Sequence, residues 1–151
     1  MRGLGAGFDP QNICALELRT DMDTTSNFRC GDPRITAIHN ACVATERANQ
    51  HGILTDCPQR DERLGWGCDA RVFVPTACYN AESYAFYRKW LADLCDSQTA
   101  EGSFLSAAPI AQFGTETGRF GWSDAALFVA NCIWRRYGDL TAIRESWRPM
   151  M

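Results

Sequence analysis

The chain has 151 residues and a formal net charge of −3, and 46% of its residues are hydrophobic against 22% charged. This suffices for one ordinary globular domain with a buried core. The mild negative charge argues against a nucleic-acid partner, which requires a basic face. Every apolar run falls short of the roughly 20 residues that cross a membrane, so we expect no membrane segment. The first residues, MRGLGAGFDPQN, lack the apolar core of a signal peptide, which slightly favours the cytoplasm.

Eight cysteines are many for this length, and they stand at positions 14, 30, 42, 57, 68, 78, 95 and 132. They are scattered without a C-x-x-C pair, and the chain has two histidines, so a zinc site is poorly supported. Cys42, Cys78, Cys95 and Cys132 fall on predicted helices, where cysteine acts as a small hydrophobic residue. We therefore expect reduced, buried thiols rather than a disulfide scaffold.

The first predicted element is a strand over residues 13–19, because this segment is β-compatible and partly alternating. A polar connection over residues 21–27 follows. Asp32 and Pro33 predict a helix start, with Asp32 as N-cap and Pro33 in the first helical position. This helix should end near Gly52. Its apolar stripe consists of Ile35, Ile38 and Cys42.

Further helices are predicted in the second half of the chain. Asp69 is expected to cap a short helix that kinks at Pro75. A longer helix spans residues 81–98, and its apolar face includes Tyr84, Tyr87, Leu91 and Leu94. Residues 100–120 are rich in Gly, Ser, Thr and Ala and predict a long loop, a kind of segment that is commonly functional.

The last part of the chain predicts two more helices. The first covers residues 124–137, Gly138 and Asp139 form a turn, and a final helix begins near Leu140. Helices joined by long loops on one side are consistent with the hairpins of an α/α barrel.

Residues 55–69, TDCPQRDERLGWGCD, concentrate the chemistry of the chain on a short segment broken by one proline and two glycines. Carboxylates can transfer protons, and arginines and carboxylates can form bidentate hydrogen bonds with sugar hydroxyls. An indole face can stack on a sugar ring. The pattern therefore favours a carbohydrate site, and the alternative is a charged surface loop with ordinary ion pairs. The residues concerned are Asp56, Arg60, Asp61, Glu62, Arg63, Trp66 and Asp69.

This segment resembles the catalytic motif of bacterial and fungal α-L-rhamnosidases, the inverting six-hairpin glycosidases, whose pattern reads roughly DCPQRDERLGWTGDA. Upstream, FRCGDP at residues 28–33 resembles the entry into the helical catalytic domain of that family. Downstream, the segments KWLADL, GWSDAA and RRYGD follow in the family's order and approximate spacing. The chain is identified as a member of this family by several separate matches.

The resemblance implies a mainly α fold: a fragment of a six-hairpin α/α barrel, preceded by a short β-strand remnant of an N-terminal β-sandwich region. Residues 1–30 would be the end of the β-sandwich region and a linker. Residues 31–151 would be the N-terminal part of the barrel catalytic domain, truncated, because the sequence predicts only about five helical segments.

The resemblance also implies residue roles. Glu62 matches the general acid, which protonates the leaving oxygen of the glycosidic bond; the alternative is a glutamate paired with Arg60 or Arg63. Asp56, Arg60 and Asp69 match residues that hydrogen-bond rhamnose hydroxyls. Trp66 and Trp122 match aromatic residues that line the sugar pocket.

Several assignments keep an alternative. Trp122 could be a core tryptophan beside a helix start. Asp124 is either a pocket residue or an N-cap, and the cap is slightly favoured. Asp61 and Arg63 are expected to be structural pairing partners.

The chain also departs from the family pattern. Cys68 stands where the family has glycine; if this position needs positive φ, the side chain costs on the order of 1–2 kcal/mol and displaces Asp69. Ser106 stands where the family often has aspartate. The family's general base is a glutamate in the later part of the barrel, and Glu145 does not match it because it falls in an ordinary predicted helix.

The function implied is hydrolysis of terminal α-L-rhamnose from glycosides with inversion, by the complete enzyme and without a metal or other cofactor. The partner would be a carbohydrate substrate, and the oligomeric state stays open. The alternatives are an inactive carbohydrate-binding remnant and a gene fragment without a function of its own.

Overall fold

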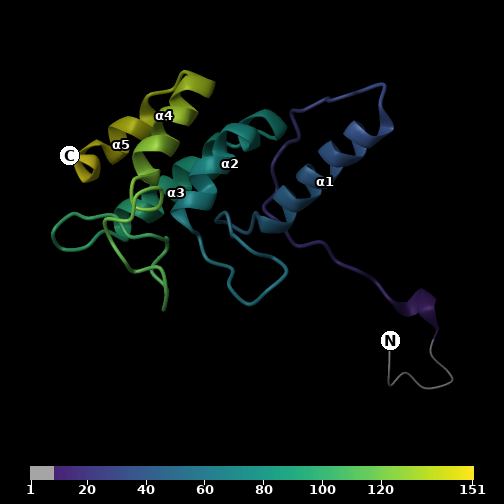
Figure 1. Ribbon diagram of the computed structural model, residues 1–151, viewed down its shortest axis with the longest axis horizontal. Helices are drawn as coiled ribbons and strands as arrows, with labels where there is room; N and C mark the ends of the chain where they lie inside the picture. The colour runs from purple at the N-terminus through teal and green to yellow at the C-terminus, as the bar shows by residue number, and fades with distance from the viewer. Residues whose placement is uncertain (1–8) are drawn as a thin grey trace.

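The computed structural model describes residues 9–151, and its regular structure is helical (Figure 1). A short 3₁₀ helix, η1 (Pro10–Asn12), comes first. The α-helices are α1 (Pro33–Asn49), α2 (Gly67–Asn80), α3 (Tyr84–Asp96), α4 (Ala125–Tyr137) and α5 (Thr141–Met150). None of the helices in this part of the chain is long and apolar enough to span a membrane.

The strand predicted for residues 13–19 is wrong. This segment is irregular, and its side chains are exposed, with Leu16 at 80% and Leu18 at 75%. Across residues 9–151, strand-like pairing is limited to isolated bridges. A strand needs a neighbour to bond its backbone groups, and no such neighbour lies beside this segment in the described structure. The β-strand remnant of a sandwich region is therefore not supported.

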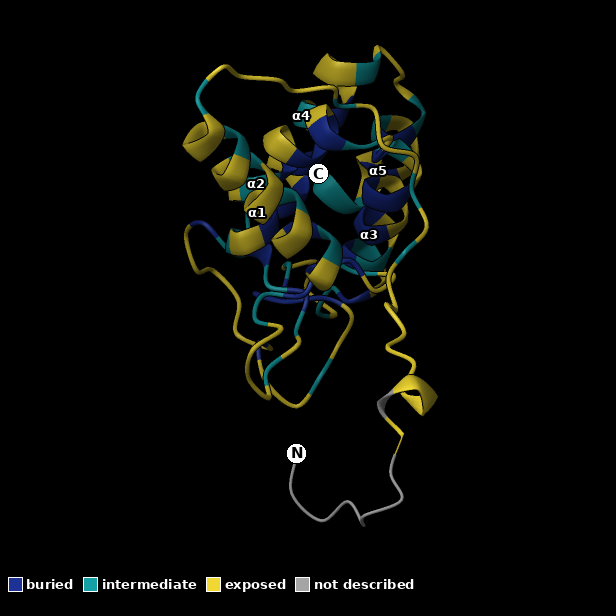
Figure 2. Ribbon diagram, turned by 90° about the vertical axis from the view of Figure 1, so that its right-hand side faces the viewer, coloured by how far each residue is buried: buried dark blue, intermediate teal, exposed yellow. Residues whose placement is uncertain are grey.

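Helix α1 begins as predicted but is buried at a different place. The Asp32 side chain accepts a hydrogen bond of 2.8 Å from the Arg34 amide, and Pro33 occupies the first turn. The predicted stripe, Ile35, Ile38 and Cys42, faces solvent instead of a core. Most of the α1 ribbon carries the colour of exposed residues (Figure 2). The buried side chains of α1 are polar and lie near its C-terminal end, where it meets α2. Helix α1 lies beside α2, at the opposite side of the molecule from α5 (Figure 1), and the Asn80 side chain of α2 donates to Glu46 near this end.

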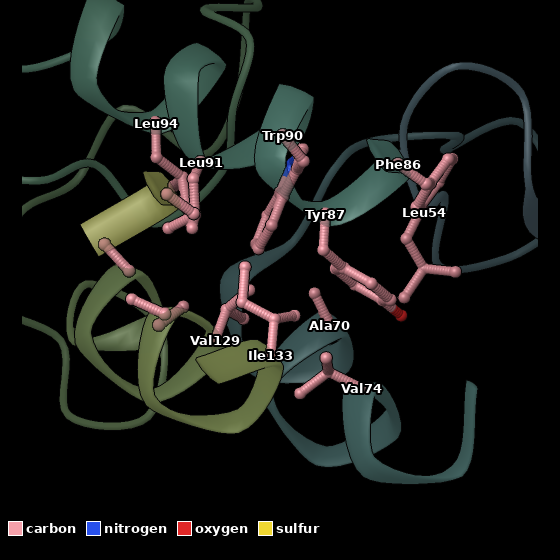
Figure 3. Packing of buried hydrophobic residues seen from close by; sticks show 14 of the residues in the cluster. Leu54, Ala70, Val74, Phe86, Tyr87, Trp90, Leu91, Leu94, Val129 and Ile133 are labelled. Atoms are coloured by element: carbon pink, nitrogen blue, oxygen red, sulfur yellow. The ribbon is translucent and has the colours of Figure 1, made fainter. Parts of the chain in front are cut away.

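The hydrophobic core lies between α2, α3, α4 and α5. Helix α3 supplies its largest side chains, Tyr87, Trp90 and Leu91, all fully buried (Figure 3). Ala70 and Val74 of α2 and Val129 and Ile133 of α4 pack around them. The predicted face of α3 is thus confirmed for Tyr87, Leu91 and Leu94, and Tyr84 is partly buried.

Helix boundaries follow local signals with small offsets. Helix α2 begins at Gly67, so Asp69 lies in its first turn instead of capping it, and the helix continues past Pro75 to Asn80. Helix α4 ends as predicted at Gly138, which adopts φ 72° and donates its amide to the Trp134 carbonyl at 2.8 Å. Glycine adopts this left-handed conformation without steric cost.

Residues 65–67 pair closely with residues 106–108, and we call this contact the motif–loop pairing. The Gly67 amide donates to the Ser106 carbonyl at 2.8 Å, and the Ala108 amide donates to the Gly65 carbonyl at 3.0 Å. From the core side, the Trp90 indole donates to the Ala108 carbonyl at 3.1 Å. A Cβ on Gly65 would stand 2.0 Å from the Ala108 carbonyl oxygen. The pairing therefore requires glycine at position 65.

Replacing Gly65 with alanine should destabilise the protein by about 1–3 kcal/mol or more, because backbone has to shift to admit the methyl group. Gly31→Ala is the matched control, since nothing lies within 4 Å of a Cβ at that position. Urea unfolding of the two variants measures the difference. Equal midpoints for both variants would show that the motif–loop pairing is not tight.

The eight cysteines are all free, but only Cys78 is buried and Cys14, Cys30 and Cys42 are exposed, so the expectation of mostly buried thiols is wrong. Cys78 is buried and Cys95 and Cys132 are partly buried, in line with their predicted role as apolar helix residues. Cys42 is exposed, so the expectation that it packs as an apolar residue is wrong; it belongs to the solvent-facing stripe of α1. Burial raises the pKa of the Cys78 thiol to about 12.

A thiol reagent in denaturant without reductant should titrate eight thiols. In the native protein Cys78 should react last, because a thiol with a raised pKa forms little thiolate, which is the reactive species. Cys78→Ala should remove the slowest phase, and Cys42→Ala should remove a fast one. A count of six or fewer in denaturant would point to disulfides.

Candidate active site

Glu62 has a partner at each of its carboxylate oxygens, one through a hydrogen bond and one through an ion pair. The Trp66 indole N–H donates to Oε1 at 2.8 Å, and Nη2 of Arg60 lies 2.7 Å from Oε2. The ion pair with Arg60 that the sequence left as an alternative is thus present. Arg63 pairs instead with Asp61, at 3.1 Å on the surface. Since Arg60 is well exposed and Trp66 is half-buried, the two donors hold Glu62 from the solvent side and from the protein side.

The loop that carries Glu62 is closed by its own backbone. The Asp56 amide donates to the Leu64 carbonyl at 3.2 Å, and the Leu64 amide donates to Oδ1 of Asp56 at 3.0 Å. Arg63 turns the chain with φ 54°, a left-handed conformation that costs a non-glycine residue about 1 kcal/mol or more. This closure returns Glu62 to Asp56: their carboxylate oxygens lie within 4.8 Å of each other.

A cavity of about 450 Å³ lies next to this loop, between α1 and α2. Three of the six predicted site residues line it: Asp56, Asp69 and Trp122. The other three, Arg60, Glu62 and Trp66, form a connected group beside Asp56 and do not line it. The remaining lining residues are polar on α1 and mostly apolar elsewhere: Thr45, Glu46, Asn49, Leu54, Thr55, Cys68, Val72 and Phe73.

The two cavity aspartates have pKa values that move in opposite directions. Partial burial of the Asp69 carboxyl raises its pKa, and the negative charges of Asp56 and Glu62 add to this; its outer side stays open to solvent. Burial acts to raise the pKa of Asp56 as well, but hydrogen bonds from the Cys57 thiol and the Leu64 amide outweigh it, so this pKa is lowered. Asp56 is therefore the more firmly ionised of the pair.

Trp122 is half-buried against the cavity. The guanidinium carbon of Arg119 lies 4.6 Å from its ring, and the ring lines the cavity, so Trp122 is not a core tryptophan. Asp124 occupies the N-cap position of α4 without a capping hydrogen bond, and it does not line the cavity. Its Oδ2 lies 3.9 Å from Nε of Arg71.

Residues 23–151 match the bacterial alpha-L-rhamnosidase 6 hairpin glycosidase domain. The chain belongs to this family. An alpha-L-rhamnosidase of Streptomyces avermitilis is 38% identical over 130 residues, which are 85% of this chain and 12% of that protein. An alpha-L-rhamnosidase of Formosa agariphila is 37% identical over 160 residues, covering 99% of this chain and 17% of that protein. The chain thus spans less than a fifth of the length of these relatives.

The solved structures agree with the sequence relatives. The crystal structure of the Streptomyces avermitilis alpha-L-rhamnosidase complexed with L-rhamnose superposes with a TM-score of 0.81 at 36% identity, over 87% of this chain and 13% of that one. The alpha-L-rhamnosidase from Dictyoglumus thermophilum gives the same TM-score at 33% identity, over 87% of this chain and 15% of that one. The mainly helical fold is therefore that of the rhamnosidase six-hairpin domain.

The departure from the family motif at Cys68 carries no backbone strain. Cys68 lies inside the first turn of α2 and has no positive φ, so the condition for a strain cost at this position is not met. The neighbouring position 67 is the one that requires glycine, because a Cβ on Gly67 would stand 2.2 Å from the Trp122 carbonyl oxygen. Ser106 is buried and donates its hydroxyl to the Glu116 carbonyl at 2.8 Å, so it supports the long loop.

The α1 wall of the cavity, above all Glu46, was not predicted from the sequence. This buried carboxylate accepts hydrogen bonds from Gln50 at 2.9 Å and from Asn80 of α2 at 2.6 Å. Burial raises its pKa, although both hydrogen bonds oppose the shift. No motif marks Glu46, and it lies off the apolar stripe on which the prediction of α1 relied.

Asp56, Cys57 and Glu62 offer ligand atoms within 4.8 Å of one another, close enough to share a metal ion. However, both oxygens of Glu62 already interact with Trp66 and Arg60, and the guanidinium charge opposes a second cation there. We therefore assign no metal to this group.

The raised pKa of Glu46 predicts a pH-dependent stability. A carboxyl whose pKa is raised on folding contributes stability below its unfolded value of 4.5, and this contribution is lost as pH rises through the folded value. The stability of Glu46→Gln relative to the wild type should therefore increase from about pH 4 to about pH 7. Urea unfolding across this range measures it.

Glu145→Gln is the control with the opposite sign. Hydrogen bonds from Arg88 lower the pKa of Glu145, so its contribution is present above its unfolded pKa and lost as pH falls. The relative stability of this variant should decrease as pH rises. The same trend in both variants would contradict the assignment of the Glu46 effect to burial.

Proposed function

We propose that this chain carries the general-acid side of an inverting α-L-rhamnosidase active site, with Glu62 as the acid. The observation that supports it is the Glu62 carboxyl, fixed by Trp66 and Arg60 beside a cavity that Asp56, Asp69 and Trp122 line. The substrates would be glycosides with a terminal α-L-rhamnose. Residues 31–151 would form the N-terminal part of the catalytic domain, and residues 1–30 would be the preceding connection.

The cavity provides contacts that suit a deoxy sugar. Asp56, whose lowered pKa keeps it ionised, and Asp69 both offer carboxylate oxygens that accept hydrogen bonds from sugar hydroxyls. Arg60 is exposed beside Glu62 and can turn to a hydroxyl when a sugar enters. Trp122, with Leu54 and Phe73, gives the cavity an apolar side for the C6 methyl group.

A second carboxylate has to activate the water, about 6.5–9.5 Å from the acid. Asp56 lies too close to Glu62 for this role, within 4.8 Å. Glu46 lines the cavity but already accepts hydrogen bonds at both oxygens. We propose that the base comes from another part of the catalytic domain, so that these 151 residues bind L-rhamnose without cleaving rhamnosides.

The 151-residue chain should therefore bind L-rhamnose in calorimetric titration and release no phenol from an aryl α-L-rhamnoside. Asp69→Asn should weaken binding, because the amide replaces one acceptor oxygen by a donor. Asp61→Asn, a change on the exposed side of the loop, is the control. Phenol release that disappears in Glu62→Gln would refute the external base.

In an active protein that carries this segment, Glu62→Gln should lower kcat about 10²–10⁴-fold on rhamnosides with poor leaving groups, because an amide cannot deliver the proton. The loss should be smaller for activated aryl leaving groups, which need less protonation. Kinetics on both substrates, with Asp61→Asn as control, test this. Small and equal losses on the two substrates would mean that Glu62 is not the acid.

A further inference from the structure

Arg71 joins α2 to the turn that precedes α4. It follows Asp69 by two residues on α2, and its guanidinium carbon lies 5.5 Å from the ring centre of Phe120 and 4.9 Å from that of Phe128. Its Nε lies 3.9 Å from Oδ2 of Asp124. A cation within about 6 Å of an aromatic ring is attracted to its face. One side chain thus contacts three residues of the 120–128 region.

Trp122 lies in the chain between two of the residues that Arg71 contacts. Phe120 and Asp124 lie on either side of it in the chain, and a Cβ on Gly121 would stand 3.6 Å from Nη1 of Arg71, so the guanidinium also covers the backbone there. The Trp122 amide donates to the Arg119 carbonyl at 3.1 Å, and its own carbonyl accepts from the Ala125 amide at 3.2 Å. A displacement of the turn would therefore move the indole.

The arrangement is poor in stabilising hydrogen bonds. Nε of Arg71 and Oδ1 of Asp124 are buried, and neither has a hydrogen-bond partner. The 3.9 Å between Nε and Oδ2 is too long for a hydrogen bond. Buried polar atoms without partners reduce stability. The contacts that remain are those of the planar guanidinium group with two aromatic rings and one carboxylate, all from the 120–128 region.

We propose that Arg71 is a positioning residue that holds Trp122 against the cavity. Because Arg71 and Asp69 both lie on α2, it would fix the position of Trp122 relative to Asp69. Both Asp69 and Trp122 line the cavity. Arg71 contacts residues on both sides of Trp122 in the chain and lies two residues from Asp69 on α2. The positioning itself is a property of the fold. Its consequence for sugar binding rests on the function proposed above.

The test follows the indole N–H signals of the tryptophans in ¹⁵N-labelled protein by NMR. Trp122→Phe identifies the Trp122 signal by its loss. In Arg71→Met this signal should shift or broaden, while those of Trp66 and Trp90 stay in place. Arg71→Lys, which keeps the charge near Asp124, should displace it less than Arg71→Met does.

Arg136→Met is the matched control. Arg136 also stacks on two rings, 5.2 Å from Tyr79 and 5.8 Å from Tyr137, but at the other end of α4 from Trp122. It should lower the melting temperature without moving the Trp122 signal. An unchanged Trp122 signal in folded Arg71→Met, or an equal shift in Arg136→Met, would overturn the proposal. Should Arg71→Met fail to fold, Arg71→Lys decides by the same criteria.

Titration with L-rhamnose separates this proposal from the function on which it rests. Arg71→Met should weaken binding about two- to fivefold, the range expected for the loss of an exposed cation–π contact, and Arg136→Met should leave it unchanged. A displaced Trp122 signal with full rhamnose affinity supports the positioning and overturns the sugar contact assigned to Trp122. A wild-type chain that does not bind L-rhamnose counts against the proposed function, and the NMR comparison then decides on Arg71 alone.

Discussion

The motif–loop pairing of residues 65–67 with residues 106–108 sets the geometry on which the candidate site depends. It fixes the start of α2, and therefore the position of Asp69 in the first turn of that helix. It also fixes the backbone of Trp66, whose indole then reaches Glu62. Beneath it, buried Trp90 joins the pairing to the core through the Ala108 carbonyl. The site is thus tied to the hydrophobic core through backbone groups, which can approach so closely because position 65 is glycine.

Around this pairing, the three acidic residues of the site lie in different environments. Glu62 accepts a hydrogen bond from Trp66, and Asp56 accepts one from the Leu64 amide of its own loop. Asp69 lines the cavity, and its pKa is raised. Carboxyl groups whose pKa values are pushed apart can play different roles at one pH. Arg60 has the freedom to change partner, because most of its side chain is exposed. Hydrogen bonds from the protein thus hold Glu62 and Asp56, whereas the Arg60 side chain faces solvent and can adjust.

The sequence predicted what depends on local signals and on the motif. Asp32 and Pro33 marked the start of α1, and Gly138 marked the end of α4, because capping acts within a few residues. The family followed from the motif around Glu62 and its companions along the chain. The strand at residues 13–19 and the burial of the α1 stripe were wrong, because both depend on neighbours distant in the sequence. The contacts of Glu46 with Asn80 and of Arg71 with Phe120 carry no local signal at all.

The attachment of α1 has a consequence for how the molecule opens. Its buried residues are the polar Glu46 and Asn49, and most of its apolar side chains face solvent. The contact with α2 includes the hydrogen bond from Asn80 to Glu46, so polar contacts rather than buried hydrocarbon dominate its attachment. A helix with so little buried apolar surface belongs to the segments of a protein that open at the lowest free energy. Since the same helix supplies Thr45, Glu46 and Asn49 to the cavity, its local opening would remove one wall of the candidate site while the core of α2 to α5 remains folded. The cavity then lasts only as long as α1 stays packed against α2.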